Sequence, residues 1–221
     1  MPKKLTMEEA ASIPLAALTA WQALIEKAGL KKGQKVLIHV GSGGVGTIAI
    51  QLAKHLGATV ATTTSTANLD LVRSLGADIA IDYKTTDFSK VLSDCDVVLN
   101  SLGTETLNKS LEVLKPGGKL ISISGPPDPD FAKDQGASWF LKLVVSLLSF
   151  GIRKKAKRHR VSYSFHFMRA SGEQLNEITF LIDAGVIHPV VDRVLPFKST
   201  SDALAYVESG RAKGKVIVKV R

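Results

Sequence analysis

The segment Val36–Gly46, VLIHVGSGGVG, constrains the fold more than any other part of the sequence. An apolar, β-rich run enters a turn, and Thr47–Leu56 then follows a helical pattern. Glycines spaced as in this turn allow a tight strand-to-helix connection, a close approach of the backbone to a pyrophosphate, and close packing of helix on strand. N–H groups at the start of the helix then face the anion. The pattern predicts a dinucleotide-phosphate site, with a purely structural turn as the alternative, and the expected contacts are Gly41, Ser42, Gly43, Gly44, Val45 and Gly46.

Short β-rich runs alternate with helical runs from Lys35 to Ser124. The β-rich runs are continuously apolar, as in DVVLN and KLISIS, which is typical of a parallel sheet covered by helices on both faces. The sequence therefore predicts a doubly wound α/β domain of the Rossmann type. Strands are expected at 35–40, 58–63, 78–81, 95–100 and 118–124, helices at 44–56, 67–75 and 104–114, and a turn at Pro116–Gly118 before the fifth strand.

Further elements are expected at both ends of the chain. The first thirty residues carry an apolar helical pattern that ends at Gly29, and Pro14 is expected to kink the helix or delay its start. Later elements are a helix at 172–184, a strand at 189–195, a helix at 200–209 and a strand at 215–220. We predict an N-terminal linking helix region at 1–30, a dinucleotide-binding domain at 31–200 with an insertion at 127–170, and a C-terminal helix and strand at 201–221.

Composition excludes several classes of protein. With 221 residues, of which 45% are hydrophobic, the chain can bury a real core. Its one cysteine, Cys95, has no second cysteine with which to form a disulfide, and the five histidines are too scattered for metal-ligand spacing. The N-terminus lacks a hydrophobic signal core, and no run reaches the roughly 18 apolar residues of a membrane span. A cytoplasmic location and the absence of a metal site are the expectations.

The insertion contains an apolar run, WFLKLVVSLLSFGI, followed by a basic run. Six of the eight residues from Arg153 to Arg160 are basic, so much of the net charge of +9 is local. We expect a helix docked on its own domain or on a partner, and a solvated basic surface. The order of apolar and then basic residues leaves a membrane-surface contact through 139–160 as an alternative, and nucleic-acid binding is a weaker one.

The end of the second strand bears on the choice of cofactor. An Asp or Glu about 20 residues past the glycine turn would bind a ribose 2′-OH and repel a 2′-phosphate. This chain has Thr62–Thr66, which contains no acid, and Arg73 lies one helix further on. We therefore predict NADP(H), with Thr63 and Ser65 near the 2′-phosphate, whereas ordinary strand chemistry is the alternative reading of the threonines.

Several segments together resemble the zinc-independent medium-chain dehydrogenase/reductases, the quinone oxidoreductase-like enzymes. They are AASIPLAALTAWQAL, VLIHVGSGGVGTIAIQLAKHLGA, LGADIAIDY, LKPGGKLISIS and AYVESGRAKGKVIVKV, in order and at the expected spacing. In that family a GroES-like barrel precedes the part matched here. The resemblance implies that the chain is the cofactor-binding portion of such an enzyme without that catalytic barrel, and that its flanking segments would pack on the barrel.

The resemblance also implies an activity and a set of contacts. The activity is NADPH-dependent reduction of a quinone or an α,β-unsaturated carbonyl, and family members often form homodimers through the cofactor domain. A non-catalytic NADP(H)-binding or interaction module is the alternative. No catalytic residue is assigned, because solvent can protonate the product and because packing is the expected role of His166 and Tyr163. Further cofactor contacts implied by the resemblance are Tyr83, Asn100, Ser101, Leu102, Ser124, Gly125, Phe165, Phe167 and Lys215.

Overall fold

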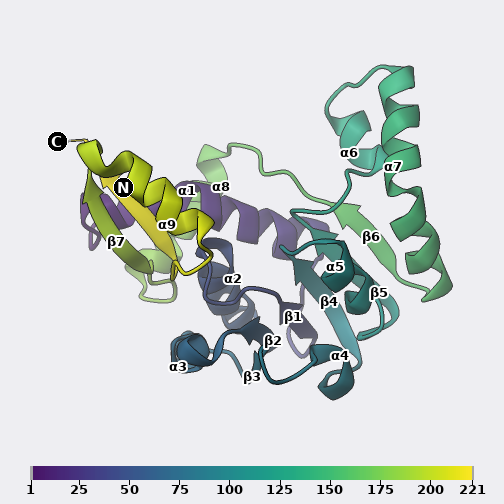
Figure 1. Ribbon diagram of the computed structural model, residues 1–221, viewed down its shortest axis with the longest axis horizontal. Coiled ribbons are helices and arrows are strands. Elements are labelled where there is room, and N and C mark those ends of the chain that lie inside the picture. Colours follow the sequence, from purple (N-terminus) through teal and green to yellow (C-terminus); the bar gives the residue numbers. More distant parts are fainter. Residues whose placement is uncertain (1, 221) are drawn as a thin grey trace.

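The computed structural model describes residues 2–220, so Met1 and Arg221, the outermost residues of the predicted domain ranges, lie outside the described part. A six-stranded parallel sheet in the order β3-β2-β1-β4-β5-β6 forms its centre (Figure 1). The strands are β1 (Lys35–Ile38), β2 (Thr59–Thr64), β3 (Ile79–Asp82), β4 (Cys95–Asn100), β5 (Leu114–Ser122) and β6 (Ser162–Phe165). This strand order is that of a Rossmann-type fold, so the predicted fold class is confirmed.

Helices cover both faces of the sheet, because successive strand residues point to opposite sides. Val36 and Ile38 belong to one core, shared with α1 (Met7–Trp21), α2 (Gly44–His55) and α8 (Gly172–Asp183). Leu37, between them, belongs to the second core. The helices that contribute to this second core are α4 (Phe88–Val91), α5 (Thr104–Ser110) and α7 (Trp139–Arg158), while α3 (Leu69–Ser74) packs on the first.

The N-terminal helix starts earlier than Pro14 would suggest. The Thr6 hydroxyl accepts the N–H of Glu9 at 3.2 Å, and the Glu9 carboxylate accepts the N–H of Thr6 at 2.8 Å. This capping box fixes the start of α1 at Met7, so the predicted delay at Pro14 is wrong. After α1 the chain forms a π-helical segment, η1 (Gln22–Lys27), and Gly29, at φ +60°, lies at the predicted end.

The fifth and sixth strands differ from the prediction. β5 contains Pro116–Gly118, which was predicted as a turn before the strand, and its register with β4 shifts between Cys95 and Val97. The segment is thus an irregularity within the strand, where proline and glycine are tolerated. β6 was not predicted, because its sequence SYSF is short and half serine. The insertion also contains α6 (Pro129–Asp134), which packs beside α7.

A second, two-stranded sheet lies at the other end of the molecule from α7 (Figure 1). It pairs β7 (Val191–Pro196) with β8 (Lys215–Lys219), and η3 (Phe197–Ser199) and α9 (Thr200–Glu208) connect them. The sheet touches the glycine turn, since the N–H of Gly214 donates to the carbonyl of Ser42 at 2.7 Å. The division of the chain into three domains stays a prediction.

Candidate functional site

The glycine turn between β1 and α2 has no room for side chains at two positions. A Cβ on Gly41 would lie 2.1 Å from Oγ1 of Thr62, and a Cβ on Gly46 would lie 2.1 Å from the carbonyl oxygen of Val40. Val40 itself has φ +56°, a left-handed conformation that is strained for a β-branched residue. Close packing of strand, turn and helix therefore requires glycine at both positions, in the way that the motif predicts.

The start of α2 is open to an anion. Its N-cap is Gly43, and no side chain of residues 2–220 caps it. The first N–H groups of a helix carry partial positive charge and lack partners within the helix, so they bind anions readily. Gly44 faces Lys215, whose Cδ would lie 2.7 Å from a Cβ on Gly44. This places the stem of the predicted basic residue beside the turn.

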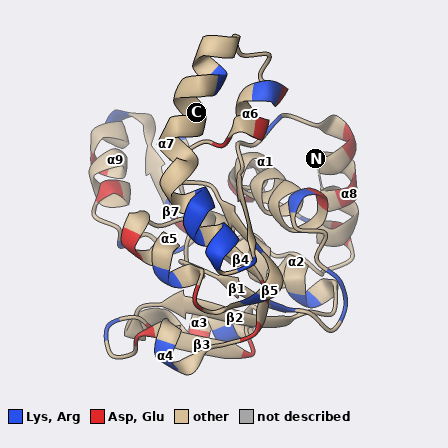
Figure 2. Ribbon diagram, turned by 90° about the vertical axis from the view of Figure 1, so that its right-hand side faces the viewer, with Lys and Arg blue, Asp and Glu red and all other residues tan. Residues whose placement is uncertain are grey.

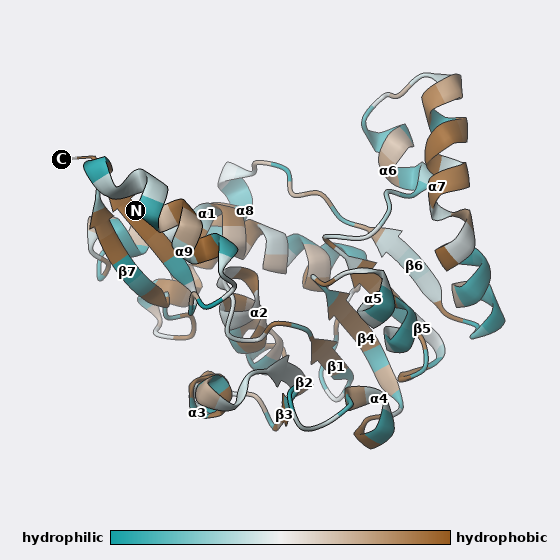
Figure 3. Cartoon of the chain, in the orientation of Figure 1, coloured by the Kyte–Doolittle hydropathy of each residue, from teal (hydrophilic) through white to brown (hydrophobic). Residues whose placement is uncertain are grey.

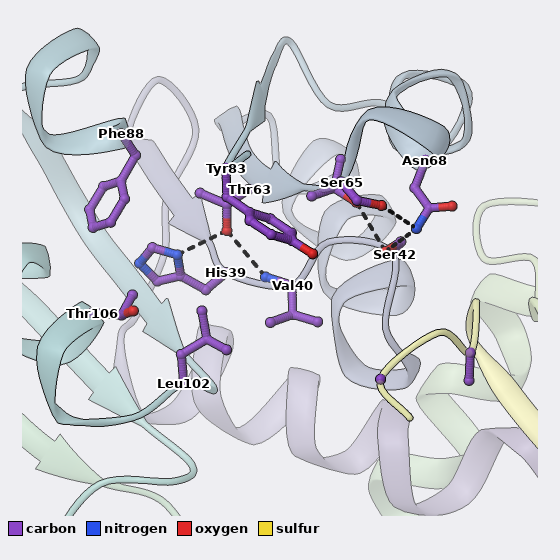
Figure 4. A pocket seen from close by; sticks show the side chains of 13 residues that line it. His39, Val40, Ser42, Thr63, Ser65, Asn68, Tyr83, Phe88, Leu102 and Thr106 are labelled. Atoms are coloured by element: carbon purple, nitrogen blue, oxygen red, sulfur yellow. Dashed lines mark hydrogen bonds between the residues drawn. The ribbon is translucent and has the colours of Figure 1, made fainter. Parts of the chain in front are cut away.

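A cavity of about 520 Å³ lies beside the turn, at the carboxyl ends of β1, β2 and β4 (Figure 4). Ligands bind at this edge in open α/β sheets, at the point where the strand order reverses. Five of the predicted residues line it, namely Ser42, Thr63, Ser65, Tyr83 and Leu102. The other lining residues are His39, Val40, Thr64, Asn68, Phe88, Thr106, Gly210 and Ala212.

Hydroxyl and amide groups meet at the end of β2 (Figure 4). Oγ of Ser42 accepts from Oγ1 of Thr64 at 3.0 Å and from Nδ2 of Asn68 at 3.1 Å. The same Nδ2 lies 3.2 Å from Oγ of Ser65, and Oδ1 of Asn68 is buried without a partner among residues 2–220. A buried acceptor without a partner is costly, so an enclosed water is the natural complement of Oδ1.

His39, a cavity residue that the sequence did not single out, is part of a fully paired hydrogen-bond chain. The Ser110 hydroxyl donates to the Thr106 carbonyl at 2.7 Å, so it accepts from Nε2–H of His39 at 3.0 Å. Thr63 accepts the N–H of Val40 and donates to Nδ1 of His39 at 3.0 Å. Burial lowers the pKa of His39 to about 4, so the ring is neutral at physiological pH. This series of hydrogen bonds orients the Thr63 side chain at the cavity.

The loops after β4 and β5 are tied to each other. Nδ2 of Asn100 donates to the Leu102 carbonyl at 2.8 Å, and Oγ of Ser124 donates to the same carbonyl at 2.8 Å. Oγ of Ser101 reaches the His39 carbonyl at 3.4 Å. Ser124 and Gly125 line a second cavity, of about 580 Å³, between α5 and α7. These predicted residues therefore shape the carboxyl edge without facing the first cavity, except for Leu102.

Phe165 and Phe167 line a third cavity, of about 280 Å³, at the end of β6. The Phe165 ring packs edge-on against Phe131, with ring centroids 5.1 Å apart. His166 between them is buried, its Nε2 has no hydrogen-bond partner in the described chain, and burial lowers its pKa to about 4. The residues predicted to outline one crevice are thus divided among three cavities, except for Asn100, Ser101 and Lys215, which line none of the three.

Two charged groups near the end of β2 are already engaged. Arg73, which the sequence places one helix beyond the threonine run, pairs with Asp70 at 3.3 Å. Asp82 ends β3 beside Thr64 and accepts from the Thr66 hydroxyl and the Lys84 N–H. These hydrogen bonds, that from Thr66 first, lower the pKa of Asp82, so the nearest strand-end carboxylate is ionised. The pairing of strands, and not the sequence position, brings this acid next to β2.

Metal-ligating side chains do not converge in the described part of this protein. Within residues 2–220, no three His, Cys, Asp or Glu residues form a group that could hold a metal ion. Cys95 lies in the core, where burial raises the pKa of its thiol to about 12. A thiol held in the protonated form is a poor metal ligand and a poor nucleophile.

Comparison with known proteins gives concordant matches. The family model described as zinc-binding dehydrogenase matches residues 75–218. The chain is 38% identical to the Danio rerio protein "NAD(P)H oxidoreductase RTN4IP1, mitochondrial" over an alignment of 230 positions, which covers 99% of this chain and 58% of the relative. It is 35% identical to the Arabidopsis thaliana "NADPH-dependent alkenal/one oxidoreductase, chloroplastic", over 98% of this chain and 48% of the relative. The chain thus spans about half the length of these two curated relatives.

A solved structure agrees with these sequence matches. The quinone oxidoreductase from Coxiella burnetii superposes with a TM-score of 0.84 at 30% identity, and the match covers 99% of this chain and 62% of that one. The likeness extends over the main sheet and the two-stranded sheet, because nearly the whole chain is covered.

Proposed function

We propose that this chain, which belongs to the medium-chain dehydrogenase/reductase family, binds NADP(H) and supports transfer of a hydride from the nicotinamide to a quinone or an α,β-unsaturated carbonyl. The observation that carries the proposal is the cavity at the carboxyl edge, next to a helix start without a side-chain cap in the described chain. The names of the relatives, an alkenal/one oxidoreductase and a quinone oxidoreductase, support the substrate class.

The residues of the site fit a dinucleotide. The glycine turn leaves its backbone open to a pyrophosphate, and the N-terminus of α2 complements the negative charge. Nδ2 of Asn68 and the Ser65 hydroxyl would donate to oxygen atoms of the ribose or its phosphate, and Tyr83, exposed over the cavity, offers an aromatic face to a base. Lys215 adds a cation beside the turn.

The preference for NADP(H) rests on the end of β2. Ser42, Ser65 and Asn68 provide hydroxyl and amide groups there, and no acid belongs to the run Thr62–Thr66. Such groups hydrogen-bond to a phosphate, whereas an acid at this position would repel it. Asp82, one strand away, is held by Thr66 and Lys84 and does not line the cavity.

The protein's share of the chemistry is orientation. When bound, the nicotinamide supplies the hydride, and the protein positions it and excludes water. Leu102 and Phe88 provide apolar surface in the cavity, and the tie from Asn100 and Ser124 to the Leu102 carbonyl fixes the loop that carries Leu102. No residue is assigned as a proton donor, because solvent protonates an enolate or a hydroquinone. We propose zinc-independent chemistry, since within residues 2–220 no three His, Cys, Asp or Glu residues form a group that could hold a metal ion.

Parallel fluorescence titrations of the chain with NADPH and NADH test the proposal. We expect NADPH to bind more tightly, and we expect Gly43→Asp to weaken both by at least about tenfold, because the new carboxylate faces the phosphates. Gly172→Asp is the matched control, since a Cβ there meets no atom within 4 Å and an acid suits the first turn of α8. Equal loss in the two variants, or no binding by the unmodified chain, would contradict the proposal.

A second variant addresses the 2′-phosphate alone. Ser65→Asp places a carboxylate among the groups at the end of β2, so NADPH affinity should fall by at least about tenfold while NADH affinity changes little. Ser201→Asp, on the exposed face of α9, controls for the added charge.

NADPH turnover with a quinone or an enone then separates an enzyme from a binding module, because binding without turnover favours the module.

A homodimer is also proposed. β6 is at one edge of the main sheet, and among residues 2–220 it pairs only with β5. Edge-to-edge pairing of two β6 strands would extend the sheet and satisfy the open backbone groups. Sedimentation equilibrium tests this, and a monomer at all concentrations would exclude it.

We propose a cytoplasmic location on the ground that a lone buried cysteine suits a reducing compartment. The names of two relatives carry other compartments, mitochondrial and chloroplastic. Fractionation of the source cells decides between these locations.

A further inference from the structure

Helix α7 and its short neighbour α6 extend from the body of the protein, at the end opposite the two-stranded sheet (Figure 1). α7 is 20 residues long and contacts α6 and β6. Only four of its side chains are buried, those of Val145, Ser149, Ile152 and Ala156. At about 100° per residue these four form one narrow stripe, so most of the helix surface faces outward.

Most residues in the first three turns of α7 are hydrophobic (Figure 3), and many of their side chains are exposed. Trp139 is 77% exposed and Leu147 is 68% exposed, although side chains of this kind are usually buried. Leu143, Leu147 and Phe150 lie on the side of the helix opposite the buried stripe. The exposed apolar side chains of α7 are Trp139, Phe140, Leu141, Leu143, Leu147, Leu148 and Phe150. A contiguous exposed patch of this composition marks a contact surface.

The last turns of the same outward surface are cationic. Figure 2 shows lysine and arginine gathered at the end of α7 that leads into β6. Lys154, Lys157 and Arg158 are exposed on the side where Leu143 and Phe150 lie, and none forms a salt bridge within the described chain. Lys154 also sits over the Phe150 ring, 5.8 Å from its centroid, where the two halves of the surface meet.

We propose that α7 docks this protein on the surface of an anionic lipid bilayer. The segment Trp139–Phe150 is about 17 Å long, close to the depth of one leaflet, so an oblique helix can bury its outward side among acyl chains. Its one charged residue, Lys142, is half-buried and lies off that outward side. The basic end then lies at the level of the lipid phosphates, with which its charges are complementary. The contact is peripheral, because no helix within residues 2–220 is long and apolar enough to cross a membrane.

Charge complementarity selects this occupant over two others. A nucleic acid would engage the basic end and leave the apolar part in water. A second copy of α7 packed in parallel would bring two clusters of unneutralised cations together, and a copy packed antiparallel would set the cations of each helix against the apolar part of the other. Both arrangements cost free energy. The neighbouring α6 does not cover the surface, because Leu143 and Leu147 remain 50% and 68% exposed beside it.

Flotation of the whole chain with lipid vesicles tests the proposal. We expect binding to phosphatidylcholine vesicles that contain about 30% phosphatidylglycerol, at least about tenfold weaker binding to phosphatidylcholine alone, and a similar loss between about 0.1 M and about 0.5 M salt. The chain has two tryptophans, of which Trp21 is half-buried in α1, so a blue shift on binding and quenching by brominated lipid would report on Trp139. This readout needs no variant.

Paired variants identify the surface. Two multiple variants of α7 should each weaken vesicle binding by at least about tenfold. One combines Leu143→Gln with Leu147→Gln, and the other combines Lys154→Gln, Lys157→Gln and Arg158→Gln. The control for the apolar variant is Phe180→Gln, at a side chain that is 70% exposed on α8. The control for the charge variant combines Lys31→Gln, Lys90→Gln and Lys198→Gln, at exposed lysines outside α7. The proposal would be overturned if the chain did not bind anionic vesicles, or if binding survived in both α7 variants. It would also be overturned if α7 mediated self-association or DNA binding and no vesicle binding. NADPH titration of the same samples keeps this outcome separate from that of the cofactor site.

Discussion

At the glycine turn, a Cβ on Gly41 or on Gly46 would lie 2.1 Å from a neighbouring atom, whereas α7 buries a single stripe of only four side chains. The first region is a site because the fold leaves backbone groups open inside a closely packed structure. The second is a candidate contact surface because the fold leaves apolar side chains uncovered. Substitutions should therefore lower stability at the turn, and at α7 they should lower binding alone.

The largest expected difference comes from the same substitution made in both regions. Gly46→Ala forces a Cβ against the Val40 carbonyl, so we expect it to lower the free energy of unfolding by about 3 kcal/mol. A Cβ on Gly151, in α7, would meet no atom within 4 Å. Gly151→Ala should therefore raise the free energy of unfolding by about 0.5 kcal/mol, because alanine favours the helix. Urea unfolding of both variants measures this, and similar values would mean that the turn is not closely packed.

The buried histidines make stability depend on pH. The folded-state pKa values of His39 and His166 are about 4, below the ordinary value of 6.5, so the unfolded chain binds more protons between these limits. The contribution of each buried histidine to the free energy of unfolding is complete above that window. It falls as the pH falls through the window, by about 2 kcal/mol per histidine between pH ~7.5 and pH ~5. Urea unfolding at the two pH values measures the change. His39→Leu should remove about half of it, and an unchanged slope would contradict the assignment.

The difference between the regions also explains what the sequence could predict. The glycine turn was predicted because steric exclusion selects glycine at fixed spacing, which a sequence displays directly. His39 and Asn68 were missed, since their roles come from Ser110 and Ser42, far away in the chain. β6 was missed because its place is set by pairing with β5. The helical pattern of 139–158 was visible, but which of its faces stays uncovered depends on the packing of α6 and β6.

Strain at Val40 provides a smaller test of the turn. Its left-handed conformation, at φ +56°, costs a β-branched residue about 1–2 kcal/mol, and glycine avoids this cost at an entropic loss of about 0.5–1 kcal/mol. We expect Val40→Gly to raise the free energy of unfolding by about 0.5 kcal/mol. Val207→Gly, at an exposed helical position on α9, should lower it by about 0.5 kcal/mol. Changes in stability of opposite sign for the two variants, measured by thermal unfolding, would support strain at Val40. A loss of stability in both variants would argue against it.

The smallest expected effect is at the exposed surface of α7. Leu147→Gln removes a side chain that contacts mainly solvent, so the free energy of unfolding should change by no more than about 0.5 kcal/mol. The same change at Leu52, 1% exposed in α2, should cost about 3 kcal/mol, because it places an amide in the core. Urea unfolding compares the two, with vesicle binding of Leu147→Gln measured on the same sample. A large loss of stability at Leu147 would mean that α7 is held by its outward surface, and the surface would then have a structural role within the chain in place of a role in contact with lipid.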